Sequence, residues 1–288
     1  MSKIEEALNK ASKNKIASSG LRVIKRDDSD NLPSHFHTSG VRTPSDSQEI
    51  ALMSDEHLLD AEELSELGVI TAGMNDDTLA NNYRDIRTKL IHKSQGKNFV
   101  VMVTSCVPED DGSNFTLNLA TAFTFDECKT SLLIDCNLHH SHLESKFNFD
   151  SQPGLTDYIN GDNIDVESIV RSVGIKRLRM IPTGTQKESA TEYFTSLKMR
   201  ELMVSLLDRY TDRYIFINSA PVKESADTRI LIDLCDYVIL TVPYGSSTIN
   251  RIKDAVDSIE REKLLGVVFH EIPNLPKFGM PGFGTSKA

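Results

Sequence analysis

The feature that most constrains the fold is a series of short, almost continuously apolar runs. They read "FVVMVT" (99–104), "TSLLIDC" (130–136), "LRMIPT" (178–183), "YIFIN" (214–218), "YVILTVP" (237–243) and "LLGVVFHEI" (264–272). Runs of this length, rich in β-branched residues and Leu, predict strands that are buried on both faces. Stretches with helical spacing lie between them, so the sequence predicts an α/β fold with a mostly parallel, doubly wound sheet flanked by helices.

The chain of 288 residues divides into three predicted regions. Residues 1–75 form an extension with a short amphipathic helix at 2–14, a flexible linker at 15–52, and a helix that starts with Ser54 as N-cap and ends at Gly68. Residues 76–273 form the α/β domain, which opens with a helix over 77–94. Residues 274–288 form a flexible, Pro/Gly-rich tail without tyrosines.

Composition and charge restrict the function further. The net charge of −10 argues against a general nucleic-acid binder, because there is no basic excess to neutralise phosphates. No apolar run approaches the roughly 20 residues that span a bilayer, and the first residues lack the apolar core of a signal peptide. We therefore expect a cytoplasmic protein. Four cysteines without a CxxC pair are expected to be buried free thiols: Cys106, Cys128, Cys136 and Cys235.

The first predicted strand leads directly into "SCVPEDDGSNFTLNLA" (105–120). In a parallel sheet, ligands bind beyond the carboxyl ends of the strands, and a helix that follows such a loop can face an anion. A phosphate loop needs glycines and a lysine, whereas this loop carries three consecutive acids and no lysine. The candidate nucleotide-binding residues are Glu109, Asp110, Asp111, Gly112, Ser113 and Asn114.

The longer segment "VTSCVPEDDGSNFTLNLATAF" (103–123) resembles the deviant Walker-A segment of the bacterial tyrosine kinases that control capsule and exopolysaccharide synthesis. The family form is Thr-Ser, two variable residues, Pro-Gly-Glu-Gly-Lys-Ser-Thr, and then a helix containing Asn-Leu-Ala. Glu109 and Asp111 stand where the family has glycines. Gly112 stands at the lysine, and Asn114 at the threonine.

Other segments, together covering residues 79–273, resemble the same family. "SLLIDCNLHHSHL" resembles its second Walker segment, with Asp135 kept and Asn137 at the second aspartate; Asn218 stands at the Walker-B aspartate. "QPGLTDYINGD" matches a Pro-Gly-Leu-x-Asp stretch. "NNYRDIRTKL" resembles the Glu-x-x-Arg-x-x-Arg helix through which these kinases assemble rings. The corresponding oligomerisation residues are Asn81, Arg84 and Arg87.

The resemblance implies a P-loop NTPase fold of the deviant Walker-A type. An active member would bind ATP and Mg²⁺, with Ser113 and Asp135 as the remaining metal ligands. The substitutions favour a catalytically degenerate, pseudokinase-like protein that needs no cofactor, in which Asp135, Asn137 and Asn218 are vestigial. The missing tail tyrosines agree, because active members phosphorylate a tyrosine cluster there.

As partners, the resemblance implies a membrane-embedded polysaccharide co-polymerase (a chain-length regulator), an active kinase paralogue or further copies of the chain. The protein would then lie at the inner membrane through that partner. Two alternatives stay open, an active tyrosine autokinase and a partition-type deviant-Walker ATPase. Metal binding by the acidic loop, by "HHSH" (139–142) or by His35 and His37 is a weaker alternative to solvated loops.

Overall fold

The computed structural model describes residues 22–25, 57–73, 78–110, 112–138, 142–149, 152–161, 164–185, 190–209 and 213–270. Within these residues the strands form one eight-stranded sheet of order β1-β8-β7-β2-β6-β3-β5-β4. The six inner strands run parallel, and the two edge strands, β1 and β4, are antiparallel to their neighbours. The strands are β1 (Arg22–Lys25), β2 (Val100–Ser105), β3 (Thr130–Asp135), β4 (Arg171–Ser172), β5 (Leu178–Ile181), β6 (Arg213–Asn218), β7 (Tyr237–Pro243) and β8 (Leu264–His270).

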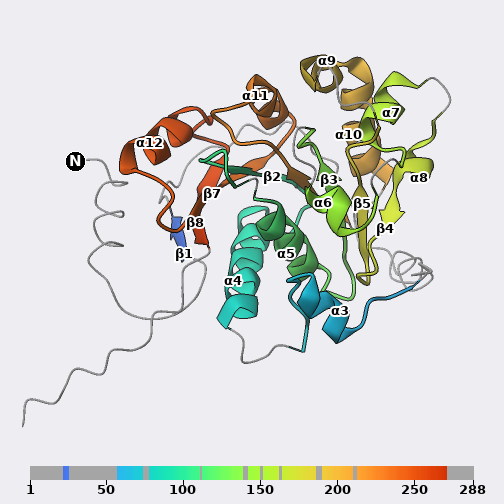
Figure 1. The fold of residues 1–288 in the computed structure, drawn as a ribbon, viewed down its shortest axis with the longest axis horizontal. Helices are drawn as coiled ribbons and strands as arrows, with labels where there is room; N and C mark the ends of the chain where they lie inside the picture. Colours follow the sequence, from blue (N-terminus) through green and yellow to red (C-terminus); the bar gives the residue numbers. More distant parts are fainter. Residues whose placement is uncertain are drawn as a thin grey trace, which may run out of the picture.

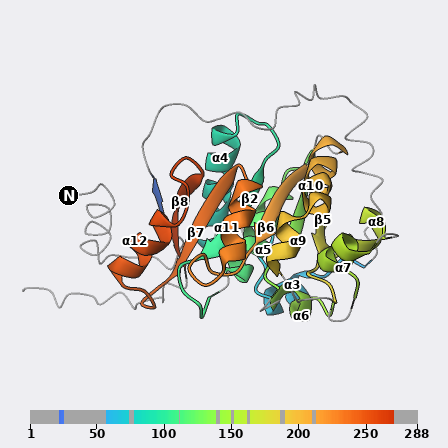
Figure 2. The ribbon, with the colours of Figure 1, turned by 90° about the horizontal axis from the view of Figure 1, so that it is seen from above.

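Helices cover both faces of the sheet, as Figures 1 and 2 show. The helices α4 and α5 lie on one face, and α9, α10, α11 and α12 lie on the other. The helices are α3 (Ala61–Glu66), α4 (Thr78–Lys93), α5 (Ser113–Phe123), α6 (His142–Lys146), α7 (Leu155–Asn160), α8 (Val166–Ile169), α9 (Ala190–Thr195), α10 (Leu197–Arg209), α11 (Ala226–Asp233) and α12 (Ile249–Asp257).

The strands alternate their side chains between two hydrophobic cores. In β2, Val101 and Val103 pack against α4 and α5, whereas Val100 and Met102 pack into the core on the opposite face. Because both faces are covered, all six residues of β2 are buried, which explains a run without polar alternation. The structure thus confirms the predicted fold class and the six predicted strands.

The helix predicted from Ser54 begins later. In the described residues α3 starts at Ala61, and its N-cap is Asp60, whose carboxylate accepts hydrogen bonds from the N–H groups of Glu62 (2.8 Å) and Glu63 (2.9 Å). The Glu63 carboxylate accepts the Asp60 N–H in return at 2.8 Å, which completes a capping box. His57 has a φ of 64°, which is incompatible with a helix that runs on from Ser54. The predicted end is confirmed, since Gly68 follows the C-cap with a φ of 66°.

The linker, the cysteines and the chain ends were also predicted from the sequence. Within the predicted linker at 15–52, the edge strand β1 pairs with β8, with Val23 opposite Val268. Cys128 is exposed, while the other three cysteines are buried and all four are free thiols. The amphipathic helix at 2–14, the tail at 274–288 and His35, His37, His139 and His140 lie outside the described residues. Among the helices that the structure describes, none is long and apolar enough to cross a membrane.

Candidate functional site

The candidate site is the loop that connects β2 to α5 at the carboxyl edge of the sheet. Strand β2 lies between β7 and β6, and the chain runs from β2 to β3, on the far side of β6. Later strands are added on both sides of β2, so this edge is where the strand order reverses and where open α/β sheets bind ligands. The position predicted for the loop is confirmed.

Gly112 is the N-cap of α5 and has a left-handed backbone with a φ of 67°. A Cβ atom at this position would lie 3.2 Å from both Thr241 Oγ1 and Val103 Cγ1. Any other residue would therefore meet both an unfavourable φ and a crowded neighbourhood. The substitution at the family's lysine position is thus accompanied by a backbone conformation that a lysine would not readily adopt.

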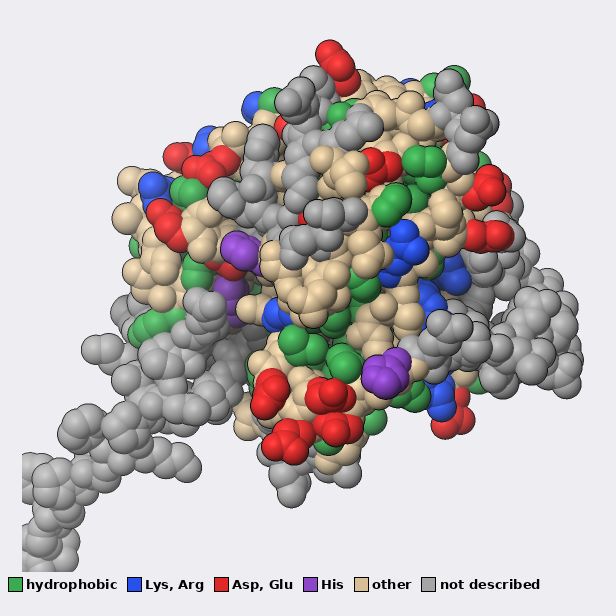
Figure 3. Space-filling view, turned by 45° about the vertical axis from the view of Figure 1, so that its right-hand side comes forward, with side chains coloured by type: hydrophobic (Ala, Val, Ile, Leu, Met, Phe, Trp, Pro, Cys, Tyr) green, Lys and Arg blue, Asp and Glu red, His purple; other side chains and the backbone are tan. Residues whose placement is uncertain are grey.

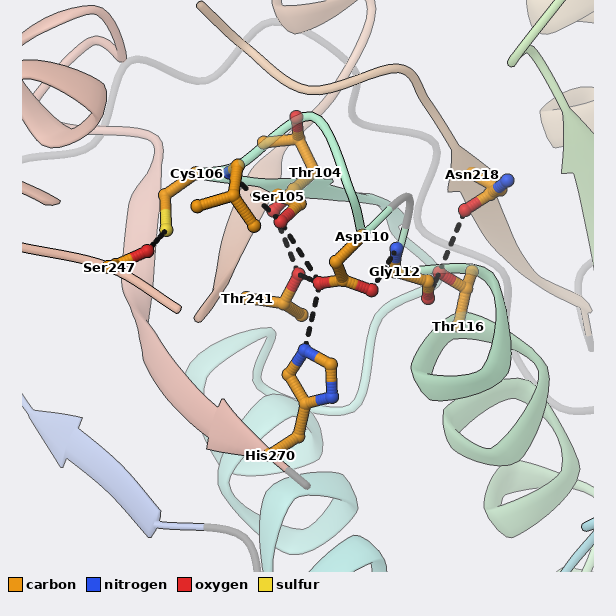
Figure 4. Close-up of polar contacts among 11 residues, drawn as sticks. Thr104, Ser105, Cys106, Asp110, Gly112, Thr116, Asn218, Thr241, Ser247 and His270 are labelled. Carbon is orange, nitrogen blue, oxygen red and sulfur yellow. Dashed lines mark hydrogen bonds and ion pairs between the residues drawn. The ribbon is translucent and has the colours of Figure 1, made fainter. Parts of the chain in front are cut away.

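The Asp110 side chain turns inward and is bound by groups from three strands and its own loop (Figure 4). The Ser105 hydroxyl donates to its Oδ2 at 3.0 Å, and the Thr241 hydroxyl donates to the same oxygen at 3.3 Å. His270 Nε2, at the end of β8, lies 2.8 Å from Oδ2. The Gly112 N–H donates to Oδ1 at 3.0 Å. The carboxylate therefore fastens the loop to β2, β7 and β8.

These contacts also set the acidity of Asp110. Burial, the largest influence, raises the pKa of the carboxyl group. The hydrogen bond and charge of His270, followed by hydrogen bonds from Gly112 and Ser105, lower it and prevail, so the pKa lies below its ordinary value of 3.8. Asp110 is consequently a carboxylate at neutral pH, and the loop holds a negative charge of its own next to the start of α5.

The other loop residues differ in their positions. Glu109 is exposed to solvent, and Asp111 lies outside the described residues. Ser113 is buried at the first position of α5. The Asn114 side-chain oxygen accepts a hydrogen bond from Lys146 of α6, whose ammonium group also donates to the Leu67 carbonyl at 2.9 Å. The first turn of α5 is thereby tied to α6 and to the segment after α3.

The structure brings together Asp135, Asn137 and Asn218, the three residues at positions where the bacterial tyrosine kinases that the sequence resembles have aspartates. Asp135 and Asn218 are opposite each other in the β3–β6 pair and, like Asn137, are fully buried. The Asn218 amide donates to Asp135 Oδ1 at 3.0 Å, and the Asn137 N–H donates to the same oxygen at 3.2 Å. Asn218 Oδ1 accepts a hydrogen bond from Thr116 of α5 at 3.3 Å (Figure 4).

The side-chain amide of Asn218 makes a combination of hydrogen bonds in this buried group that a carboxylate could not make. An asparagine donates to Asp135 with its NH₂ group and accepts from Thr116 with its oxygen. An aspartate at the same position could not donate to Asp135 and would place a second buried carboxylate against the first. An amide that donates to Asp135 therefore stands where a second carboxylate would repel it.

The segment predicted as the Pro-Gly-Leu-x-Asp match packs against the loop after β5. The Asp157 carboxylate accepts hydrogen bonds from the N–H groups of Thr185 (2.8 Å) and Gly154 (2.9 Å) and from the Thr185 hydroxyl. Burial raises the pKa of Asp157, but these hydrogen bonds hold it below its ordinary value. The buried Glu144 carboxylate accepts the Gly184 N–H at 2.9 Å. Both acids position this loop within the protein.

The arginines of α4 make contacts within their own chain. Arg84 donates to Asn81 Oδ1 at 2.8 Å and to the Ala72 carbonyl at 3.1 Å. Arg87 donates to the Ala122 carbonyl at 3.2 Å and lies 3.9 Å from a carboxylate oxygen of Asp126. The role of Asn81, Arg84 and Arg87 in assembly stays a prediction.

Acidic side chains gather on one part of the surface (Figure 3). Helix α3 and its N-cap contribute exposed acids that follow one another closely in the sequence: Asp60, Glu62, Glu63 and Glu66. A surface of this sign repels phosphate groups, so it offers no contact to a nucleic-acid backbone.

The residues of the loop and of the buried group do not fit a Mg²⁺–nucleotide. The carboxylate of Asp110 occupies the Gly112 N–H, Gly112 stands at the lysine position, and Asn218 stands at the position of an acidic metal ligand. Within the described residues no group of three or more His, Cys, Asp or Glu side chains could hold a metal ion. His270 and Thr241 are the site residues that the sequence did not indicate, because both lie more than a hundred positions from the loop and belong to separate strands.

Comparisons with known proteins give one consistent group. No protein-family model matches the chain. EpsB of Ralstonia solanacearum, assigned as a tyrosine-protein kinase, is 30% identical over 211 residues, which are 71% of this chain and 27% of EpsB. Tyrosine-protein kinase CpsD of Streptococcus pneumoniae is 28% identical over 71% of this chain and 90% of CpsD. The chain thus spans only about a quarter of EpsB but most of CpsD.

Solved structures agree in fold. The kinase domain of the Escherichia coli tyrosine kinase ETK has a TM-score of 0.63 at 18% identity, covering 84% of this chain and all of that domain (100%). The VpsO kinase domain has a TM-score of 0.58 at 26% identity, covering 74% of this chain and 97% of that domain. The mostly parallel sheet flanked by helices is therefore that of bacterial tyrosine-kinase domains, a P-loop fold.

Proposed function

Since the chain is a homologue of the bacterial tyrosine-protein kinases, we propose that it is a catalytically degenerate relative that acts by binding a partner rather than by phosphoryl transfer. The observation that carries the proposal is the N-terminus of α5, where Gly112 stands at the family's lysine position and donates its N–H to the Asp110 carboxylate. The four contacts of Asp110 fasten the loop to β2, β7 and β8, and one of them occupies a backbone N–H at the start of α5.

Electrostatics at the loop supports this proposal. A phosphate group about 4 Å from the Asp110 carboxylate would be repelled by roughly 4 kcal/mol per charge pair at an effective dielectric constant near 20. Turning the carboxylate away would give up hydrogen bonds to a charged group, each worth about 1.5–3 kcal/mol. No lysine is present in the loop to offset either cost. Nucleotide binding is therefore disfavoured in both conformations of Asp110.

The buried group at Asp135 supports the proposal independently. Metal-assisted phosphoryl transfer depends on carboxylates that hold Mg²⁺ against the phosphates. In this chain Asn218 uses its amide to stabilise Asp135 by hydrogen bonding, and Asn137 adds a backbone N–H. The strands and helices around Asp135, Asn137 and Asn218 are intact. This combination is expected of a protein that keeps its partner-binding surfaces but has lost catalytic turnover.

The proposed role follows from the kinases that the chain resembles. We infer a function in capsular or exopolysaccharide biosynthesis and export, at the cytoplasmic side of the inner membrane. There the chain would bind a membrane-embedded chain-length regulator or an active kinase paralogue. The net charge of −10 and the acidic surface of α3 disfavour a nucleic-acid partner. The second candidate is an active tyrosine autokinase, which the naming of the relatives as kinases favours.

Isothermal titration calorimetry of the full chain with ATP and Mg²⁺ tests the proposal. We expect no saturable heat, whereas the ETK kinase domain in the same buffer serves as the positive control. Co-expression with a chain-length regulator of the same export system should give a complex that survives purification without nucleotide. Tight, Mg²⁺-dependent ATP binding, or transfer of phosphate from ATP that Asp135→Ala abolishes, would instead establish the autokinase.

A further inference from the structure

One tyrosine differs from the other described tyrosines in its exposure. Tyr244 exposes 52% of its surface, more than any other tyrosine that the structure describes; Tyr210 lies outside the described residues. Tyr158 is half-buried, and the rest are buried in the cores: Tyr83, Tyr193, Tyr214 and Tyr237. Burial, the largest influence, raises the pKa of the Tyr83 hydroxyl well above its ordinary range and that of Tyr237 to about 12. Those hydroxyl groups are out of reach of another protein, whereas that of Tyr244 is accessible.

Tyr244 stands at the start of the turn between β7 and α12. Its N–H donates to the His270 carbonyl at 3.0 Å, which fixes the backbone, while its side chain makes no hydrogen bond to the described residues. Gly245 follows with a φ of 78° and open space around it, so the turn projects from the edge of the sheet. Ile249, 49% exposed, lies at the start of α12. The turn therefore presents the exposed aromatic side chain of Tyr244 on a backbone that is fixed by a hydrogen bond.

The same turn contacts the candidate site on two sides. Ser247 lies 3.1 Å from the Cys106 thiol, in the loop after β2. The backbone carbonyl of His270 accepts the Tyr244 N–H, and the ring of the same histidine is hydrogen-bonded to Asp110. A change of charge at Tyr244 would consequently be placed next to the residues that fasten the loop.

We propose that Tyr244 is a phosphorylation site for an active tyrosine kinase of the group to which the relatives belong. The proposal rests on the proposed function, in which such a kinase is a partner. In the step, the Tyr244 phenolic oxygen attacks the γ-phosphorus of ATP held by that kinase. The bond from this phosphorus to the β-phosphate oxygen breaks, ADP leaves, and the phenolic proton passes to a base of the kinase.

The modification has a physical consequence for the partner interaction. A phosphotyrosine adds a charge of about −1.5 to −2 and three acceptor oxygens at neutral pH. Arg251, exposed in the first turn of α12, is a cation on the same turn-helix segment, and the helix N-terminus favours negative charge. Phosphorylation would thus convert an aromatic contact surface into an anionic one, which changes the class of partner that can bind it.

Phosphate mapping with an active kinase tests the proposal. The full chain is incubated with Mg²⁺-ATP and the purified ETK kinase domain, and the modified residues are identified by mass spectrometry. We expect one phosphate on Tyr244. The variant Tyr244→Phe should lose most of this incorporation, whereas Tyr158→Phe, at the half-buried position, should retain it. Thermal unfolding of both variants should match the unmodified chain, because neither hydroxyl makes a hydrogen bond that the structure describes.

The outcomes separate this proposal from the proposed function. Phosphate on a different tyrosine, or none on this chain while the ETK domain phosphorylates itself in the same tube, overturns the assignment of Tyr244 and leaves the degenerate-kinase proposal intact. Phosphate on Tyr244 without added kinase supports the site and contradicts the proposed lack of catalysis. Phosphate on Tyr244 that requires the added kinase supports both.

Discussion

The side chain of Asp110 determines what the loop can do. Its carboxylate reaches donors on β2, β7 and β8 and holds the loop against the sheet, at a position where the resembling kinase family also has an acid. In this structure the loop is therefore held closed by contacts within the protein itself. Glu109, its exposed neighbour, has no such effect and serves as the comparison.

The lowered pKa of Asp110 predicts a pH dependence of stability. A carboxyl group with a folded-state pKa below its unfolded value contributes stability above the unfolded pKa, and this contribution is lost as the pH falls through the folded pKa. We expect Asp110→Asn to lower the free energy of unfolding by about 1–3 kcal/mol at neutral pH, the range for hydrogen bonds to a charged group. The difference from the unmodified chain should shrink below about pH 4.

Urea unfolding of the two proteins at several pH values measures this difference. The matched control is Glu109→Gln, which removes an exposed carboxylate one residue away and should leave the free energy of unfolding unchanged at every pH. A loss at neutral pH that is equal for the two variants would show that Asp110 is not fastened in solution. A difference that grows on acidification would have the wrong sign and would contradict the contacts described.

At the scale of elements, helix α5 begins at a residue that only glycine suits. We expect Gly112→Ala to destabilise the fold by about 1–2 kcal/mol for the left-handed backbone, with a further loss from the contacts at 3.2 Å to Thr241 and Val103. The control is Gly245→Ala, where φ is 78° and nothing lies within 4 Å, so only the backbone cost applies. Urea unfolding should show the larger loss at Gly112. An equal or smaller loss there would contradict the crowding.

The elements also show why part of the fold could be predicted and part could not. The inner strands β2, β3, β6 and β7 are buried on both faces, and this burial is what makes their sequences almost continuously apolar. Strands β1 and β4 were not predicted, because they are edge strands of four and two residues and do not produce a long apolar run. Likewise the position of the loop was predictable, but no signal links Asp110 to His270, which only the ordered sheet brings within 2.8 Å.

At the scale of the whole molecule, two separate groups oppose phosphate and metal binding at this edge of the sheet. Asp110 joins the loop to β7 and β8, and Asn218 joins β6 to Asp135 on β3 and to α5. These groups lie on opposite sides of β2, but Gly112 and Thr116 link them by hydrogen bonds: the Gly112 N–H donates to Asp110, and the Thr116 hydroxyl donates to both the Gly112 carbonyl and Asn218. Their effects are therefore expected to be coupled. A change that restores one of them leaves the other barrier in place.

Stepwise restoration of the family residues is therefore the last prediction. The loop variant Glu109→Gly, Asp111→Gly, Gly112→Lys should gain little affinity for Mg²⁺-ATP in calorimetry. A lysine at position 112 would have to adopt a backbone that Gly112 now holds at a φ of 67°, and Mg²⁺ would still lack its carboxylates. Adding Asn137→Asp and Asn218→Asp should produce measurable, Mg²⁺-dependent binding.

The second set of changes should also lower stability when no nucleotide is present. The carboxylate introduced by Asn218→Asp would lie beside the buried Asp135, and two carboxylates about 4 Å apart repel by roughly 4 kcal/mol at an effective dielectric constant near 20. Unfolding with and without Mg²⁺-ATP measures this loss and its recovery on binding. Full binding by the loop variant alone would show that Asn218 is no barrier. Full binding by the unmodified chain would show that the Asp110 contacts yield to a nucleotide, and the degenerate-kinase proposal would then be wrong.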